Sequence, residues 1–103
     1  MPQSGFFIAQ GAVKDFQDFF ARYGSKVESV AEAFGGQFLV ASRSAQAAEG
    51  HWVGNWTVVI RFPSTEAAVA FYDSEGYAPL RDLRIDELTE WANIAIVPGL
   101  DLF

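Results

Sequence analysis

His51 is the only histidine of the chain and stands in the segment Glu49-Gly50-His51-Trp52. Imidazole has an ordinary pKa of about 6.5, so His51 could accept a proton near neutral pH and act as a general base. No other residues of the sequence complete a convincing triad with it, and Gly50 and Trp52 place it in a loop before an apolar segment. His51 is therefore either a proton acceptor or a polar residue of that loop.

Arg84 lies on an otherwise apolar helical stripe, because Leu80, Arg84 and Leu88 follow one another at intervals of four. A guanidinium holds carboxylate or enolate oxygens with a fixed fork of donors, so Arg84 could anchor a small acidic or phenolic substrate. The alternatives are a structural ion pair, since buried charges are seldom left alone, or a side chain that extends past the core to water. The candidate partners for an ion pair are Asp73, Asp82 and Glu87.

Four further residues could line a ligand site, namely Arg43, Arg61, Tyr77 and Trp56. The two arginines lie at or near the ends of expected strands, where the walls of ligand clefts are common. Ion pairs are commoner than ligand sites, however, so a structural role is favoured for both, and Arg61 could instead lie at an interface. Tyr77 could donate a hydrogen bond to a ligand oxygen and Trp56 could line an aromatic pocket, although packing in the core explains both as well.

The composition excludes several classes of function. The 103 residues suit one domain, spanning 1–103, and half of them are apolar, ten being Phe. The net charge of −6 argues against nucleic acids and anionic membrane surfaces as partners. With no cysteine and no metal-ligand spacing among the acidic residues, we expect neither a metal nor an organic cofactor. We see no signal peptide and no run of about 20 apolar residues, and so expect a cytoplasmic protein.

Apolar patterning and turn residues predict four strands and two helical regions. The expected strands are 6–10, 37–41, 56–62 and 91–97, with a loop over 42–55. One long helix begins after Asp15 as its N-cap, bends at Gly24 and ends at Gly35-Gly36. The second region has a short helix capped by Ser64 and another from Pro79 to about 88. The apolar tail 100–103 is expected to dock on the rest of the protein.

Two strand–helix–strand units with right-handed crossovers predict an α+β fold, the ferredoxin-like βαββαβ arrangement, with a four-stranded antiparallel sheet and helices on one face. The strands 56–62 and 91–97 carry apolar residues on both faces. In a strand with one solvated face, apolar and polar residues would alternate along the chain. The second face therefore needs a cover. A second copy of the chain is the simplest one, which predicts a homodimer through the sheet face.

The segments AFGGQFLV, EGHW and VVIRFPSTEAAVAFYDSEGYAPL, with LR following, together resemble the domain-of-unknown-function 1330 family, a member of the dimeric α+β barrel superfamily. The resemblance covers essentially the whole chain and implies a ferredoxin-like dimer. Relatives in the wider superfamily include cofactor-free monooxygenases, isomerases, decarboxylases and cyclases. Any of these activities would come to this chain by analogy of fold alone.

We therefore expect one ligand pocket per protomer, between the sheet and the helices. It would bind, and could transform without a cofactor, a small polar or aromatic metabolite. Arg84 would anchor the ligand, Tyr77 would donate a hydrogen bond, and His51 would accept a proton. The alternative is a non-catalytic dimeric module that binds a ligand or another protein, so the sequence leaves open whether the protein is an enzyme.

Overall fold

Four strands pair into one antiparallel sheet in the computed structural model, which describes residues 3–100. The strands are β1 (Gly5–Val13), β2 (Gln37–Ser42), β3 (Trp56–Phe62) and β4 (Thr89–Pro98). Their order is β2-β3-β1-β4, so β1 and β3 are central and β2 and β4 are the edges. Every neighbouring pair is antiparallel, as expected for the ferredoxin-like fold.

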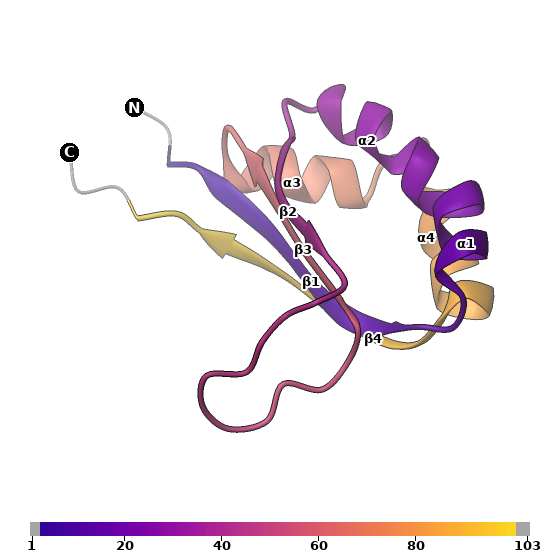
Figure 1. The fold of residues 1–103 in the computed structure, drawn as a ribbon. Helices are drawn as coiled ribbons and strands as arrows, with labels where there is room; N and C mark the ends of the chain where they lie inside the picture. Colours follow the sequence, from indigo (N-terminus) through magenta and orange to yellow (C-terminus); the bar gives the residue numbers. More distant parts are fainter. Residues whose placement is uncertain (1–2, 101–103) are drawn as a thin grey trace.

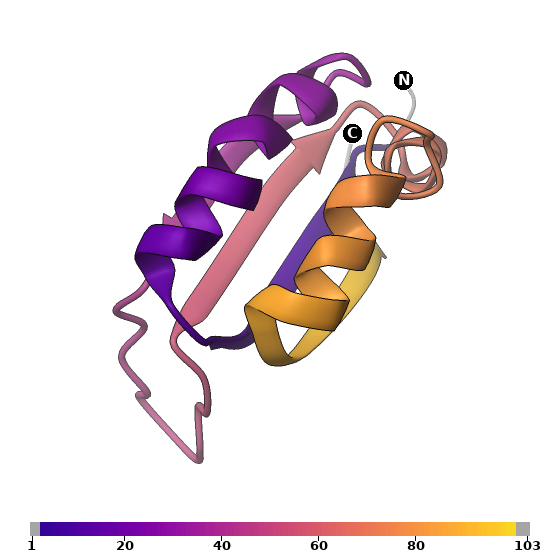
Figure 2. The same ribbon diagram turned by 90° about the vertical axis from the view of Figure 1, so that its right-hand side faces the viewer.

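The helices all lie on one face of this sheet (Figure 1). They are α1 (Phe16–Phe19), η1 (Phe20–Gly24), α2 (Ser25–Glu32), α3 (Thr65–Tyr72), α4 (Ala78–Leu83) and η2 (Arg84–Leu88). The segments η1 and η2 are single π-helical turns, each continuous with an α-helix. Figure 2 shows the α1–η1–α2 helix and the α4–η2 helix side by side above the sheet. The predicted α+β ferredoxin-like fold is therefore confirmed.

Local side-chain chemistry sets the helix boundaries. The Asp15 carboxylate accepts hydrogen bonds from the Gln17 and Asp18 amides at 2.9 and 3.1 Å, and the Ser64 hydroxyl accepts one from the Ala67 amide at 3.1 Å. Both predicted N-caps are thus present, and each satisfies amide groups that have no partner within the helix. Gly35, with φ +82°, follows the first helix in the left-handed conformation that glycine adopts without strain.

The helix-facing side of the sheet forms the core. On β3, the side chains of Trp56, Val58, Ile60 and Phe62 point to this side and are buried. Helical aromatic residues pack onto them, and the ring centroids of Phe62 and Phe71 are 5.3 Å apart. Alternation along the strand, with period two, explains why one side chain in two enters the core.

The opposite face of the sheet was predicted to be buried as well, and within residues 3–100 it is not covered by a helix. Its large apolar residues include Phe6, Ile8, Val40, Val59 and Val97, which are half-buried or exposed. The loop between β2 and β3 touches one end of this face, where Gln10 Nε2 donates to the Val53 carbonyl at 3.0 Å. The face therefore stays open to solvent in the single chain.

No helix of the described residues is long and apolar enough to cross a membrane. The apolar tail 100–103 was expected to dock on the rest of the protein; Leu100 is 83% exposed, and 101–103 lie outside the described residues.

Asn55 joins the long loop to the end of β1. Its side-chain oxygen accepts from the Val13 amide at 2.8 Å, and its side-chain nitrogen donates to the Val13 carbonyl at 3.1 Å. These bonds extend the contact of β1 with β3 past its last register pair, Gly11 with Trp56. The side chain of Asn55 therefore holds both backbone groups of Val13 where β3 has ended.

We expect Asn55→Ala to lower the free energy of unfolding by about 1–3 kcal/mol, because it leaves the part-buried Val13 groups unpaired. Urea unfolding followed by circular dichroism measures this loss. The exposed amide variant Gln17→Ala is the control and should change stability by less than about 0.5 kcal/mol. Equal stability of the two variants would contradict the role of Asn55.

Candidate functional site

A cavity of about 480 Å³ opens between the sheet and the first helical segment. The strands β2 and β3 form one wall, and α1, η1 and α2 form the other. Most of the lining is apolar, with aromatic residues from both walls: Phe16, Phe19, Phe20, Phe38 and Trp56. The polar lining residues are Tyr23, Glu28, Ser42 and Arg43. A mostly apolar cavity with a few polar groups is the usual composition of a small-molecule site.

Small residues in both walls leave the space open. Gly24 lines the cavity from the helical side and Ala41 from the edge strand β2. Neither residue has a side chain that reaches across, whereas protein interiors of this size are normally filled. Gly24 and Ala41 therefore add little side-chain volume to the cavity walls.

The buried polar group of the cavity wall is Tyr23, which lies in the π-helical turn η1. Its ring packs against Phe19, with centroids 4.9 Å apart. Its hydroxyl oxygen is 2.7 Å from that of Tyr77, the residue preceding α4, and both phenols are buried. This hydrogen bond joins the two helical regions of the fold across the interior.

Arg84, the first residue of η2, is only 2% exposed. Within residues 3–100 no carboxylate forms an ion pair with it, and its Nε has no hydrogen-bond partner. Two of the carboxylates expected as partners are engaged elsewhere, Asp82 with Arg81 and Glu87 with Arg22. The expected structural ion pair of Arg84 is therefore not formed among these residues.

Burial raises the pKa of the Tyr23 hydroxyl well above its ordinary value of 10, and Tyr77 adds to this, while the positive charge of Arg84 opposes it. Burial disfavours the charge of Arg84, but the neighbouring Tyr77 and Tyr23 outweigh that effect, so its pKa is raised. At neutral pH, Tyr23 is thus a neutral hydrogen-bond donor and Arg84 a buried cation.

Arg43 and Trp56, two of the predicted ligand-binding residues, both line the cavity. The guanidinium carbon of Arg43 lies 4.8 Å from the centroid of the Phe16 ring, within the range of a cation–π contact. Because Arg43 is exposed, it lies where the cavity meets solvent. Trp56 is buried at the start of β3, against Phe19.

The other predicted residues lie apart from the cavity lining. Tyr77 and Arg84 are not among the lining residues, although the Tyr77 hydroxyl bonds to that of Tyr23. His51 is exposed in the long loop and does not line the cavity. Arg61 is exposed on the open sheet face, where its side chain donates to the Ser4 hydroxyl at 3.3 Å. The structure thus places two of the six candidates, Arg43 and Trp56, in the cavity lining, and the other four outside it.

Tyr23 was not among the candidate site residues predicted from the sequence, where it belongs to the long helix expected after Asp15. The available signal was its hydroxyl: a phenol among several Phe residues on a buried stripe needs a hydrogen-bond partner. The sequence gives no indication that this partner is Tyr77, which is 54 residues away.

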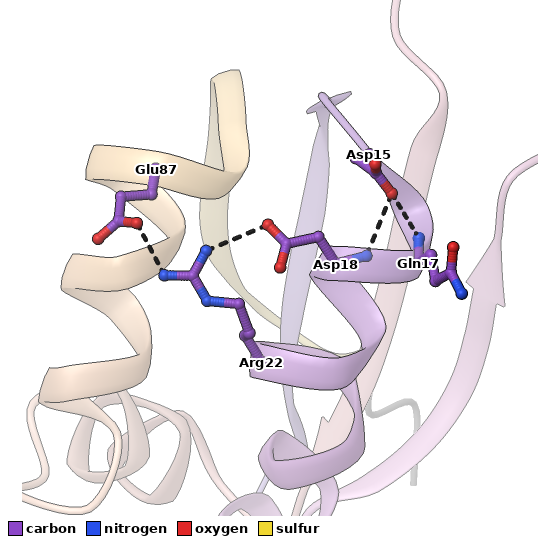
Figure 3. A network of polar contacts seen from close by, with 5 residues as sticks. All are labelled: Asp15, Gln17, Asp18, Arg22 and Glu87. Atoms are coloured by element: carbon purple, nitrogen blue, oxygen red, sulfur yellow. Dashed lines mark hydrogen bonds and ion pairs between the residues drawn. The ribbon is translucent and has the colours of Figure 1, made fainter.

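An ion-pair network holds the two π-helical turns together at the surface (Figure 3). The guanidinium of Arg22 contacts Asp18 Oδ2 at 3.1 Å and Glu87 Oε1 at 2.7 Å. Arg22 precedes Tyr23 in η1, and Glu87 lies in η2 with Arg84. The network therefore helps to fix the two turns that carry the buried polar residues. Within residues 3–100, no group of three His, Asp or Glu side chains could hold a metal ion.

The raised pKa of Tyr23 predicts a loss of stability at alkaline pH. Above pH 10 the unfolded state releases the phenolic proton while the folded state keeps it, so stability falls from about pH 10 up to the pKa in the folded state. One such proton contributes about 1.4 kcal/mol per pH unit. Between pH 8 and pH 11, the free energy of unfolding measured with urea should therefore fall more for the wild type than for Tyr23→Phe. Parallel losses would show that Tyr23 titrates normally.

Solved structures share this fold at low sequence identity. A protein of unknown function from Rhodopseudomonas palustris has a TM-score of 0.74 and 15% identity, over 98% of this chain and 85% of that one. A protein of unknown function from Nitrosomonas europaea has a TM-score of 0.64 and 18% identity, over 100% and 94%. A candidate antibiotic biosynthesis monooxygenase from the same organism has a TM-score of 0.62 and 16% identity, over 99% and 95%. These likenesses establish the α+β ferredoxin-like fold.

No functionally curated protein matches the sequence. A family model does match, over residues 4–100, in agreement with the resemblance seen in the sequence. The chain belongs to the family described as Domain of unknown function (DUF1330).

Proposed function

We propose that the protein is a homodimer in which each protomer binds one small, largely aromatic metabolite in the cavity between the sheet and the helices. The observation that carries this proposal is the cavity itself, about 480 Å³ in a chain of 103 residues. Its volume lies within the range of about 300–1,000 Å³ that is common for small-molecule sites. An interior left unfilled to this extent forfeits packing contacts that a ligand would restore.

The lining suggests how such a ligand would be held. Phe19 and Trp56 offer aromatic surface inside the cavity, and Arg43 offers a cation where the cavity meets solvent. Tyr23 is the buried polar residue of the lining, and its hydroxyl is hydrogen-bonded to that of Tyr77. An aromatic body with one polar group fits this distribution better than a fully polar metabolite does.

Binding without a reaction is the simpler form of this function. The solitary histidine does not line the cavity, and the high pKa of Tyr23 makes its phenol a donor rather than a base at neutral pH. A cofactor-free transformation is the second candidate, in which Tyr23 donates a proton or hydrogen bond to a developing oxyanion. The fold shared with a candidate monooxygenase is compatible with either form.

The open sheet face supports the homodimer. It presents apolar side chains from β1, β2, β3 and β4, an arrangement that usually marks an interface. A second copy offers the same apolar surface, and a twofold axis would pair the two faces in one closed contact. Arg61 would then lie within or beside the interface rather than at the ligand site.

Filling the cavity tests the binding site. Ala41→Phe places a ring into the cavity from β2, whereas Ala70→Phe adds the same ring to the exposed surface of α3 as a control. With 2-naphthoate as the probe, isothermal titration calorimetry should show one site per protomer in the wild type and in Ala70→Phe. Ala41→Phe should weaken binding at least about tenfold, or about 1.4 kcal/mol. Equal binding by all three proteins would place the probe elsewhere.

A charge on the open sheet face tests the dimer. Ile8 is 37% exposed at the centre of this face, and Ile85 is 53% exposed on the helical side. Light scattering after gel filtration should give about twice the chain mass of 11.3 kDa for the wild type and for Ile85→Glu. Ile8→Glu should give the monomer, because an unpaired charge would be buried in an apolar contact. A monomeric wild type, or a dimeric Ile8→Glu, would argue against the sheet-face interface.

A further inference from the structure

We infer that Arg43 makes the cavity selective for aromatic acids, which bind with the ring inside and a carboxylate or similar oxyanion at the mouth, where the cavity meets solvent. This inference rests on the proposed binding function and adds the chemical class of the ligand and its orientation. Arg43 would contact the oxyanion directly.

The guanidinium of Arg43 lies over an aromatic ring of the cavity wall. Its central carbon is 4.8 Å from the centroid of the Phe16 ring, and both residues line the cavity. This contact places the cation at the cavity itself and not out in solvent. Because a contact with a ring face takes up none of the five N–H donors in a regular hydrogen bond, these donors remain for the two oxygens of a carboxylate.

The charge of Arg43 is not paired with an acidic side chain of the described part of the chain. The ion pairs among residues 3–100 are formed by Arg22 and Arg81. Arg43 is also the one cation among the described residues of the cavity lining. An acidic ligand group at this position would gain a charge-assisted hydrogen bond that a neutral group of the same shape would not.

Glu28, the acidic residue of the lining, lies toward the other end of the helical wall. It follows Phe16 by twelve residues along the continuous α1–η1–α2 helix, about 18 Å at a rise of about 1.5 Å per residue. Exposed charges farther apart than about 8 Å are largely screened at physiological ionic strength. Glu28 therefore does not cancel the attraction of Arg43, and it disfavours an acid at its own end of the cavity.

Aromatic surface continues from Arg43 into the cavity. The ring of Phe16 lies under the guanidinium, Phe19 follows with centroids 6.3 Å apart, and Trp56 is 5.3 Å from Phe19. All three rings line the cavity, and Trp56 is buried. A single ligand can therefore place a ring against this aromatic surface and an acidic substituent beside Arg43.

The interior of the cavity offers no charge to an acid. Apart from Glu28 and Arg43, the lining residues are uncharged. Tyr23 is the buried polar residue among them, and its hydroxyl is already hydrogen-bonded to that of Tyr77. A carboxylate moved inside would lose its water without gaining a counter-charge, which is costly. The ring therefore enters and the acidic group stays at the mouth.

Two probes of nearly the same shape separate the charge from the aromatic body, namely 2-naphthoate and neutral 2-naphthamide. Isothermal titration calorimetry at pH 7 should show that the wild type binds 2-naphthoate about fivefold more tightly, as expected for one exposed but well-placed ion pair. Arg43→Gln removes the charge and should abolish this preference, while the affinity for 2-naphthamide changes by less than about twofold.

Lys26→Gln is the matched control. Lys26 is exposed on the same helix and outside the cavity lining, so its replacement changes the net charge equally and should leave the preference intact. High salt is an independent test, because Arg43 is exposed. In about 1 M salt, where the screening length is about 3 Å, the preference of the wild type for 2-naphthoate should shrink. Circular dichroism confirms that both variants are folded.

Equal binding of the two probes by the wild type, or an intact preference in Arg43→Gln, would overturn the inference while leaving the cavity as a binding site. An equal loss in Lys26→Gln and Arg43→Gln would assign the preference to net charge and would also overturn it. Failure of the wild type to bind either probe would refute the proposed function for aromatic ligands of this size, and this inference with it.

Discussion

A hydrogen bond between two buried phenols joins the two halves of this fold. Tyr23 belongs to the helix of the first strand–helix–strand unit and Tyr77 to the helical region of the second, and their oxygens lie 2.7 Å apart. Around them, aromatic rings continue into both units: Phe19 packs on Tyr23, and Phe71 packs on Tyr77 with centroids 4.5 Å apart. The spacing of the two helices above the sheet therefore depends on a polar contact inside an aromatic layer.

This contact also explains why the candidate site lies where it does. The first helix is held toward the second by Tyr23 and by the surface pair Arg22–Glu87. Over β2, at the other side of that helix, the small residues Gly24 and Ala41 leave the cavity open. Tyr23, whose hydroxyl joins the helices, is thus also the buried polar residue of the cavity lining.

The sequence was sufficient to predict the elements that depend on local chemistry. The strand 56–62 has the predicted bounds, because its apolar and β-branched residues lie between a glycine-containing loop and a proline. The caps Asp15 and Ser64 were found because capping uses residues close together in the chain. The π-helical turns were missed, since a single shifted turn leaves no periodic signal of its own.

The site was less predictable because it depends on residues far apart in the chain. Arg43 and Trp56 were expected to line a pocket and do line the cavity. The pairing of Tyr23 with Tyr77 is set by how two helices pack, and the lack of a carboxylate next to Arg84 is set by where the acidic side chains point. Neither the pairing nor the lack of a carboxylate can be predicted from the spacing of residues in the sequence. His51, which attracted attention as a solitary histidine, lies in the exposed loop.

The most direct test of the central claim is a crystal structure of the protein grown with 2-naphthoate. The account predicts the naphthalene ring among the aromatic residues of the cavity, between β2 and the first helix. Density for 2-naphthoate only on the open sheet face, or no bound 2-naphthoate at all, would contradict it.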